Sequence, residues 1–149
     1  RFASSTGVVY KVCDIDSNIK FVDITYASTR TADEPQFLSN PERVLQGYST
    51  TVPASNTDCG GSSTAGGNAT YFQEAPVGID FDAANNTTLQ ALSISSTKQS
   101  VLVKEGKIYA YSKGSGTKVK KGLIRVKSIT KGTAAYAQGK VVFDVKIQK

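Results

Sequence analysis

Paired carboxylates are the residues of this chain whose spacing comes closest to a chemical site. Asp14 and Asp16 stand two residues apart and precede Asn18, and Asp80 and Asp82 repeat the spacing. In a strand, side chains at positions i and i+2 point to the same face, where carboxylates can hold Ca²⁺ with help from amide and carbonyl oxygens. Both pairs are therefore calcium candidates. The simpler interpretation is that these acids face solvent beside the many lysines.

Most other chemistry is excluded by the residues that the chain lacks. It contains no histidine, which excludes Ser-His-Asp and Cys-His catalysis and His-ligated zinc. An EF-hand is excluded because the loop starting at Asp14 has Ile19 at position six and Thr25 at position twelve, in place of Gly and Glu. A glycosidase needs two carboxyls placed across a sugar, and a chain of this length leaves little room for such a cleft. We expect no enzymatic activity and no cofactor.

The two cysteines, Cys13 and Cys59, are too few for a four-thiolate metal site but sufficient for one disulfide. On the chain-entropy model a bridge closing so long a loop would stabilise the fold by roughly 4 kcal/mol. It would also fix a Gly- and Ser-rich segment, residues 54–70, which we expect to be a flexible surface loop. The Ser-, Thr- and Asn-rich composition favours the bridge, and two separate thiols are the alternative.

Tyr109 and Tyr111 stand on one face of a predicted strand and form a possible ligand face. With Tyr71 and Phe72 they could stack on sugar rings, as in a carbohydrate-binding β-sandwich module. Nucleic-acid binding would need aromatic residues interleaved with cations and a recognisable motif. Since no such motif accompanies them, we do not expect a nucleic-acid partner. The simplest interpretation is that the tyrosines pack in the core.

Positive charge is concentrated in one stretch of the sequence. The formal net charge is +6 and the isoelectric point is about 9.3. Residues 113–131 hold seven of the cations, from Lys113 to Lys131. Such a run in a meander is typical of a solvated strand face and hairpin tips, and we favour this interpretation over a ligand site.

The two ends of the chain carry regular strand patterns. Along residues 140–149 apolar side chains alternate with polar ones, which is typical of a half-buried strand. Residues 6–14 and 18–26 alternate as well and are predicted to form a hairpin across a short polar turn. Both terminal strands are free of Pro, so each could be donated to a neighbouring molecule. The candidate donor residues are Val8, Tyr10, Val12, Val141, Phe143, Val145 and Ile147.

Further strands are predicted at 48–52, 71–72, 77–81, 89–95, 100–104, 107–112 and 119–127. Glu105 and Gly106 have the length of a hairpin loop, and Gly122 indicates a bulge or bend. The single helical signal lies near residues 40–46, where Ser39 or Asn40 can cap a helix with Pro41 in its first turn. These elements predict an all-β chain: one antiparallel β-sandwich domain over residues 1–149, with about nine or ten short strands.

A resemblance adds to this interpretation. The segments Lys121-Gly-Leu-Ile-Arg-Val-Lys and Val141-Val-Phe-Asp-Val-Lys-Ile-Gln-Lys resemble the close of exported, mostly uncharacterised β-sandwich proteins of Bacteroidetes. The resemblance covers about a fifth of the chain and carries no catalytic motif. It implies a β-sandwich in an extracellular or cell-surface location. Arg1 also fits a processed mature end, and an excised fragment would look the same.

Taken together, these observations predict a non-enzymatic extracellular structural or adhesive protein that acts through its surfaces and edges. No apolar run approaches the roughly 20 residues that a membrane helix needs, so we expect no membrane span. The expected partners are proteins or further copies of the chain, including assembly as a filament subunit through exchange of a terminal strand. A carbohydrate-binding module with exposed Tyr109 and Tyr111 is the alternative, with glycans as its ligands.

Overall fold

The computed structural model describes residues 1–10, 19–29, 32–48, 67–114, 116–131 and 139–149. Within these residues the chain forms nine strands in three antiparallel sheets, with two α-helices of six residues each. The all-β prediction is confirmed, although a second short helix occurs where one at most was expected. In the described part of the chain no helix has the length and apolar character needed to cross a membrane.

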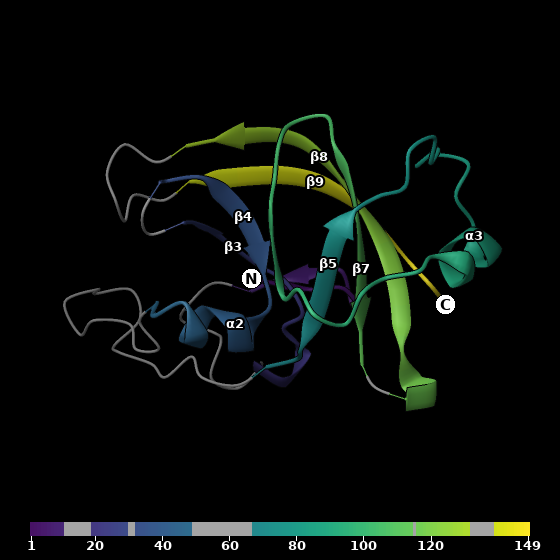
Figure 1. Ribbon diagram of the computed structural model, residues 1–149, viewed down its shortest axis with the longest axis horizontal. Helices are drawn as coiled ribbons and strands as arrows, with labels where there is room; N and C mark the ends of the chain where they lie inside the picture. Colours follow the sequence, from purple (N-terminus) through teal and green to yellow (C-terminus); the bar gives the residue numbers. More distant parts are fainter. Residues whose placement is uncertain (11–18, 30–31, 49–66, 115, 132–138) are drawn as a thin grey trace.

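A four-stranded sheet forms the centre of the fold (Figure 1). Its order is β5-β7-β8-β9, where the strands are β5 (Thr70–Glu74), β7 (Ile108–Lys113), β8 (Lys120–Thr130) and β9 (Lys140–Ile147). The predicted C-terminal strand is thus confirmed as β9. The pairing of β8 with β9 shifts register between Val126 and Ser128, and the shift marks a bulge. The bulge therefore lies at Lys127 instead of Gly122.

Gly122 does not form the predicted bend, and a glycine is required there for a steric reason. A Cβ atom there would come within 2.5 Å of the Tyr111 ring and would also collide with the carbonyl oxygen of Lys146. Gly122 pairs with Tyr111 on β7 and with Ile147 on β9. The absence of a side chain lets three strands approach around a buried aromatic ring.

The second sheet has the order β3-β4-β6, formed by β3 (Thr25–Ser28), β4 (Pro35–Leu38) and β6 (Ser100–Leu102). A third sheet pairs β1 (Phe2–Ala3) with β2 (Val8–Val9). The predicted hairpin of residues 6–14 with 18–26 is wrong in its described part, because Val8 and Val9 pair with β1 and β3 pairs with β4. Part of the second predicted strand is a 3-10 turn, η2 (Ile19–Phe21). The intervening residues 11–18 lie outside the described residues.

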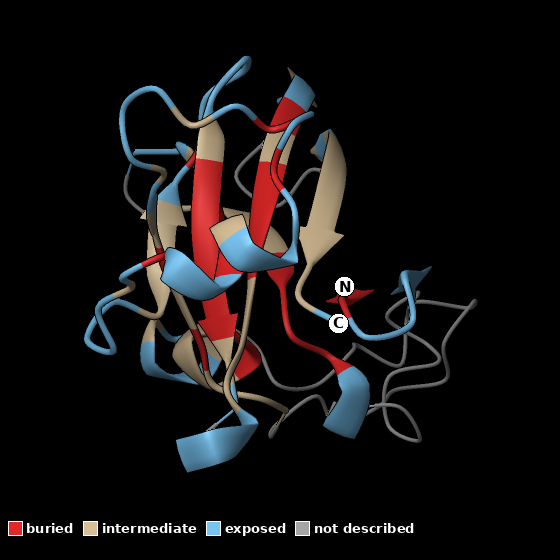
Figure 2. Cartoon of the chain, turned by 90° about the vertical axis from the view of Figure 1, so that its right-hand side faces the viewer, coloured by how far each residue is buried: buried red, intermediate tan, exposed pale blue. Residues whose placement is uncertain are grey.

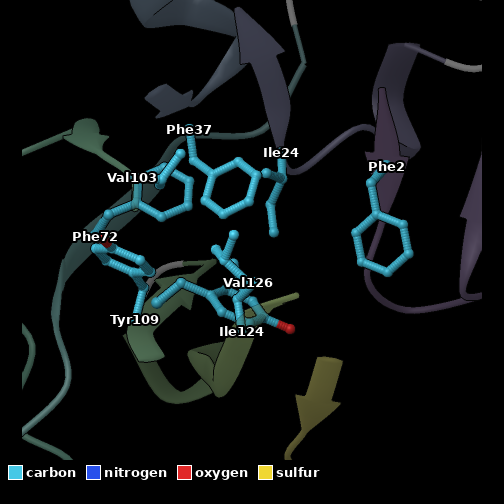
Figure 3. Close-up of a cluster of buried hydrophobic side chains, with 9 residues drawn as sticks. Phe2, Ile24, Phe37, Phe72, Val103, Tyr109, Ile124 and Val126 are labelled. Atoms are coloured by element: carbon cyan, nitrogen blue, oxygen red, sulfur yellow. The ribbon is translucent and has the colours of Figure 1, made fainter. Parts of the chain in front are cut away.

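The two larger sheets share one apolar core, which we call the first core. It includes Phe37 and Ile24 on one side and Phe72, Tyr109, Ile124 and Val126 on the other, and these side chains point toward one another (Figure 3). Phe2 enters it from the N-terminal strands, where Phe2 and Ile24 form an isolated bridge. Two sheets around one core fit the predicted sandwich, which stays a prediction. At one margin β5 also contacts the segment that leads into β6, since the Phe72 N–H donates to the Lys98 carbonyl at 2.9 Å.

The outer face of the four-stranded sheet carries a second core. Residues 75–95, which we call the outer cover, pack Phe81, Leu89 and Leu92 on Ala110 of β7 and Leu123 of β8. The cover contains helix α3 (Asn86–Ala91), which begins after Asn85, whose side chain accepts from the Thr88 N–H at 3.1 Å. The strands predicted at 77–81 and 89–95 are therefore wrong. These segments form turns and a helix, and their apolar residues pack on one face of the sheet. Figure 2 shows this side of the molecule, with exposed chain in front of buried strands.

The predicted hairpin at Glu105 and Gly106 is also wrong. β6 pairs with β4 in one sheet, and β7 pairs with β5 and β8 in the other, so residues 103–107 carry the chain from sheet to sheet. The Val103 N–H donates to the Pro35 carbonyl at 2.8 Å, and the Gly106 N–H donates to the Val126 carbonyl at 2.9 Å. The short apolar strands on each side are the same in both arrangements, so the local sequence cannot distinguish them.

The predicted helix near residues 40–46 is confirmed as α2 (Asn40–Leu45). The Ser39 hydroxyl accepts from the Glu42 N–H at 3.2 Å, and Pro41 lies in the first turn. Pro needs no backbone donor at that position. A further 3-10 turn, η3 (Gly116–Lys118), precedes β8.

Candidate functional site

The predicted aromatic ligand face is not on the surface. Tyr109 is 3% exposed and Tyr111 is 0% exposed, and both belong to the first core. They do share one strand face, but that face points inward, and Phe72 joins them there. The Tyr109 hydroxyl accepts from the Lys104 N–H at 2.9 Å, and burial raises the pKa of this phenol. The prediction of an exposed face at Tyr109 and Tyr111 is therefore wrong.

The carboxylates Asp80 and Asp82 do not form the predicted same-face strand pair. Asp80 closes a turn, with its Oδ1 accepting from the N–H groups of Asp82 and Ala83 at 2.8 and 3.1 Å. Asp82 instead forms an ion pair with Arg125 at 2.7 Å. Among the described residues no three His, Cys, Asp or Glu side chains gather into a metal-binding group. Other predicted site residues lie outside the described residues: Cys13, Cys59, Asp14, Asp16 and Val12.

Two cations of the basic stretch, Lys121 and Arg125, hold the outer cover in place. The Lys121 Nζ donates to the carbonyls of Gln90 and Leu92 at 2.8 and 2.5 Å. Arg125 lies 4.4 Å above the Phe81 ring and pairs with Asp144 and Asp82. Cations bound to carbonyls, carboxylates and an aromatic face stabilise packing. This supports a structural interpretation of these cations over a ligand site.

The outer edge of β9 is the feature that could bind another molecule. Among the described strands β9 pairs with β8 alone. The Gln148 N–H donates to the Lys121 carbonyl at 2.9 Å, and backbone groups alternate in direction along an antiparallel strand. The N–H and C=O groups of Phe143, Val145 and Ile147 consequently point away from β8. We call this row of groups the β9 edge.

Other sheet margins in the described part of the chain are shorter or already bonded. β3 and β6 are four and three residues long, whereas β9 has eight residues. β5 is bonded along its margin to the end of the outer cover, since the Gln73 side chain donates to the Ser93 carbonyl at 2.7 Å and accepts from the Ser95 N–H at 3.3 Å. The β9 edge is therefore the longest open margin that the structure describes.

Two charged side chains of β9, Asp144 and Lys146, do not guard its edge. Edge strands are commonly protected by lysines and other charges that repel a second strand. Here Asp144 pairs with Arg125 at 2.7 Å, and the Lys146 Nζ donates to the carbonyls of Asp82 and Ala84 at 2.6 and 3.0 Å. Both charges are thus directed to the outer face of the sheet, where they hold the outer cover.

An apolar hollow of about 100 Å³ lies beside this edge. Val141 and Phe143 line it from β9, and Phe2 and Phe143 meet edge to face with ring centroids 5.4 Å apart. Val9, which also lines the hollow, is 69% exposed. The remaining lining residues are Arg1, Ile24, Tyr26 and Phe37. An incoming strand on β9 would bring a side chain close to this hollow.

A larger hollow of about 360 Å³ lies between the ends of β4, β6 and β8. Its floor includes Leu102, Val103 and Ile129, and its rim carries two acids and two lysines. One of the acids, Glu105, already accepts from the Ile129 N–H at 2.5 Å. A rim of balanced charge selects neither an anion nor a cation, so this hollow points to no particular ligand.

A buried polar cluster, which we call the Asp23 junction, joins four segments of the chain. Asp23 is 0% exposed and accepts from the Ser4 N–H and Ser4 hydroxyl at 2.8 and 2.7 Å and from the Asn68 amide at 3.0 Å. Its Oδ2 also pairs with the Lys113 Nζ at 2.7 Å. Sequence reasoning missed this cluster. Its signal was weak: Lys113 continues the inward-facing alternation of Tyr109 and Tyr111, which would place a cation at the end of the core.

Comparison with protein-family models, with characterised proteins and with solved structures finds no match. The geometry of the β9 edge and of the Asp23 junction is therefore what bears on function.

Proposed function

We propose that this chain is a non-enzymatic extracellular structural or adhesive protein that binds protein partners by strand addition at the β9 edge. One observation carries the proposal: β9 is an eight-residue margin strand in which the charges of Asp144 and Lys146 are bound on the outer face of the sheet. In strand addition, main-chain hydrogen bonds supply affinity, and pockets for alternate side chains supply specificity. The apolar hollow lined by Val141 and Phe143 supplies such a pocket.

The first partner to consider is a second copy of the chain. Val8 and Val9 of β2 are 42% and 69% exposed, so β2 leaves apolar residues on the surface, and Val9 lines the same hollow. Exposed apolar residues beside an unpaired strand edge favour association over the monomeric state. The sequence pattern makes Val141, Phe143, Val145 and Ile147 of β9 candidate donor residues as well. Because β9 is paired with β8, we propose that it accepts the incoming strand. The proposed donor is then the N-terminal strand with Val8, Tyr10 and Val12, of which Val12 lies outside the described residues.

The carbohydrate alternative receives no support from the tyrosines, because they lie in the first core. An extracellular location is supported by the resemblance of the C-terminal segments and by the Ser-, Thr- and Asn-rich composition.

The proposal is tested by closing the edge without disturbing the sheet. In Val145→Pro the lost N–H is one that points away from β8, and Pro is tolerated on the outward side of margin strands. We expect the variant to fold and to lose association, measured as the sedimentation coefficient over a concentration series. The matched control Val145→Thr keeps the N–H and the side-chain shape and should associate like the parent chain.

Two results would count against strand addition at this edge. One is a parent chain that sediments as a monomer at all concentrations and binds no extracellular protein partner. The other is association that is unchanged in Val145→Pro while circular dichroism shows an intact sheet. As a check on the geometry, Asp144→Pro removes an N–H directed at β8 and should unfold the strand pair.

A further inference from the structure

The Asp23 junction brings an amine and a carboxylate together out of water. The Lys113 Nζ lies 2.7 Å from the Asp23 Oδ2, with the lysine side chain 14% exposed and the aspartate side chain 0% exposed. The chain places Lys113 at the end of β7 and Asp23 just before β3, so the contact joins the two larger sheets. A second ion pair of nearly equal length, Lys107 with Glu74 at 2.8 Å, is 54% and 59% exposed. The two pairs therefore differ in burial and hardly at all in distance.

We propose that Lys113 and Asp23 condense to an intramolecular amide, an isopeptide bond between the two side chains of the folded chain. This bond goes beyond the function proposed above and does not depend on it. Reacting groups held in contact have effective concentrations of about 10⁵ to 10⁸ M in well-oriented cases. In water the condensation is opposed by hydration of the separate charges, and burial has already removed most of that hydration.

The atoms of the step balance without a co-reactant. One proton first passes from the Lys113 ammonium to the Asp23 Oδ2, 2.7 Å away, which leaves a neutral amine and a carboxylic acid. The amine Nζ then attacks the carboxyl carbon of Asp23, the bond from that carbon to Oδ2 breaks, and Oδ2 leaves as water. The ammonium begins with three protons: one stays on the amide nitrogen, and two leave with the oxygen. An ammonium and a carboxylate thus become one neutral amide and one water molecule.

The neighbours of the pair are placed to assist both oxygens. The Asn68 amide donates to Oδ1, the oxygen that remains and carries negative charge in the tetrahedral intermediate. The Ser4 hydroxyl and N–H donate to Oδ2, the oxygen that leaves. The Ser4 hydroxyl, 2.7 Å from Oδ2, can pass a proton to this oxygen as the carbon–oxygen bond breaks.

Tyr111 adds a second hydroxyl at this place. It is fully buried, and its hydroxyl lies near Ser4 and Asp23 without a hydrogen bond of ordinary geometry to either. Burial raises the pKa of Tyr111, the nearby Ser4 hydroxyl partly offsets this, and the charge of Asp23 reinforces it. A neutral phenol beside Ser4 can complete a proton relay to the leaving oxygen.

Mass spectrometry of the unmodified sequence tests the bond directly. The chain is purified folded, reduced and alkylated, unfolded in guanidinium, and weighed intact. We expect a mass lower than that of the sequence by one water molecule. Tryptic digestion should then yield a branched peptide containing Asp23 and Lys113, with no cleavage after Lys113. In the same digest Lys107 and Glu74 should appear unlinked, which makes the exposed pair an internal control.

Three substitutions distinguish the covalent amide from an ordinary ion pair between Lys113 and Asp23. Lys113→Arg keeps a cation beside Asp23 but has no amine to acylate, so it should have the full mass and a lower unfolding midpoint than the parent chain. Ser4→Ala should slow the loss of water in freshly refolded chain. Lys107→Arg should leave the deficit of one water unchanged.

The proposal is overturned if the folded parent chain retains its full mass and trypsin cleaves after Lys113. It is also overturned if the water loss maps to other residues. A Lys113→Arg chain that fails to fold does not obscure the answer, since the mass and peptide map of the parent chain decide it.

Discussion

Gly122→Ala is the substitution whose effect can be worked most directly from the structure. The new Cβ would lie 2.5 Å from two ring atoms of Tyr111 and would also meet the Lys146 carbonyl oxygen of β9. Tyr111 is 0% exposed, so its ring cannot move without displacing the first core. The carbonyl belongs to the neighbouring strand, so it cannot move without distorting the pairing of β8 and β9.

The size of the effect follows from two opposing contributions. Overpacking a close-packed site costs about 1–3 kcal/mol, and the upper end applies because neither neighbour can yield easily. Replacing Gly by Ala in a strand recovers about 0.5–1 kcal/mol of backbone entropy. We therefore expect a net loss of about 2 kcal/mol in the free energy of unfolding.

The assay is urea unfolding at neutral pH, followed by far-UV circular dichroism. Gly78→Ala serves as the control: its Cβ meets nothing within 4 Å, but its φ is +83°. It should show only the cost of a left-handed backbone, about 1 kcal/mol. If Gly122→Ala unfolds at the same urea concentration as the parent chain or a higher one, the close approach of β7, β8 and β9 around Tyr111 is refuted.

Two further predictions concern the outer cover and its anchoring charges. Leu89 is 2% exposed in the second core, so Leu89→Ala should lower the free energy of unfolding by about 2–4 kcal/mol; an unchanged urea midpoint would show that α3 is not packed on the sheet. Hydrogen bonding to Arg125 lowers the pKa of Asp144 below its ordinary value of 3.8. The resulting stabilisation is present above pH 3.8 and is lost as pH falls through the lowered pKa of the folded state. In Arg125→Gln the pKa of Asp144, followed by NMR of its carboxyl carbon, should rise, and identical titrations in both chains would contradict the ion pair.

The local sequence pattern was sufficient to predict an element where one of its faces packs on the core and the other faces away from it. Residues 140–149 alternate cleanly, and β9 lies there with Val141, Phe143 and Val145 turned to the first core. Ser39 and Pro41 likewise mark the start of α2 because cap geometry depends on neighbouring residues only.

Local pattern failed where the answer depended on partners distant in the sequence. The spacing of Tyr109 and Tyr111 indicates that they share a strand face but does not indicate whether that face is exposed to solvent or buried in the core. The turn at Gly106 has the length of a hairpin, although its flanking strands join different sheets. Asp23 and Lys113 are 90 residues apart, and no short-range signal relates them.

The four-stranded sheet is covered on both faces, but its central strands have more packing and hydrogen-bonding partners than its marginal strand β9. Ala110 and Leu123 are closed in by the outer cover, while their neighbours Tyr109 and Ile124 are closed in by the first core. Among the strands that the structure describes, β9 has a bonded neighbour on one side only. Partial openings of a folded protein begin at such margins and leave the interior intact. Strand addition at β9, as proposed above, would therefore leave the central pair β7 and β8 folded, and the proposed assembly would not require passage through the unfolded chain.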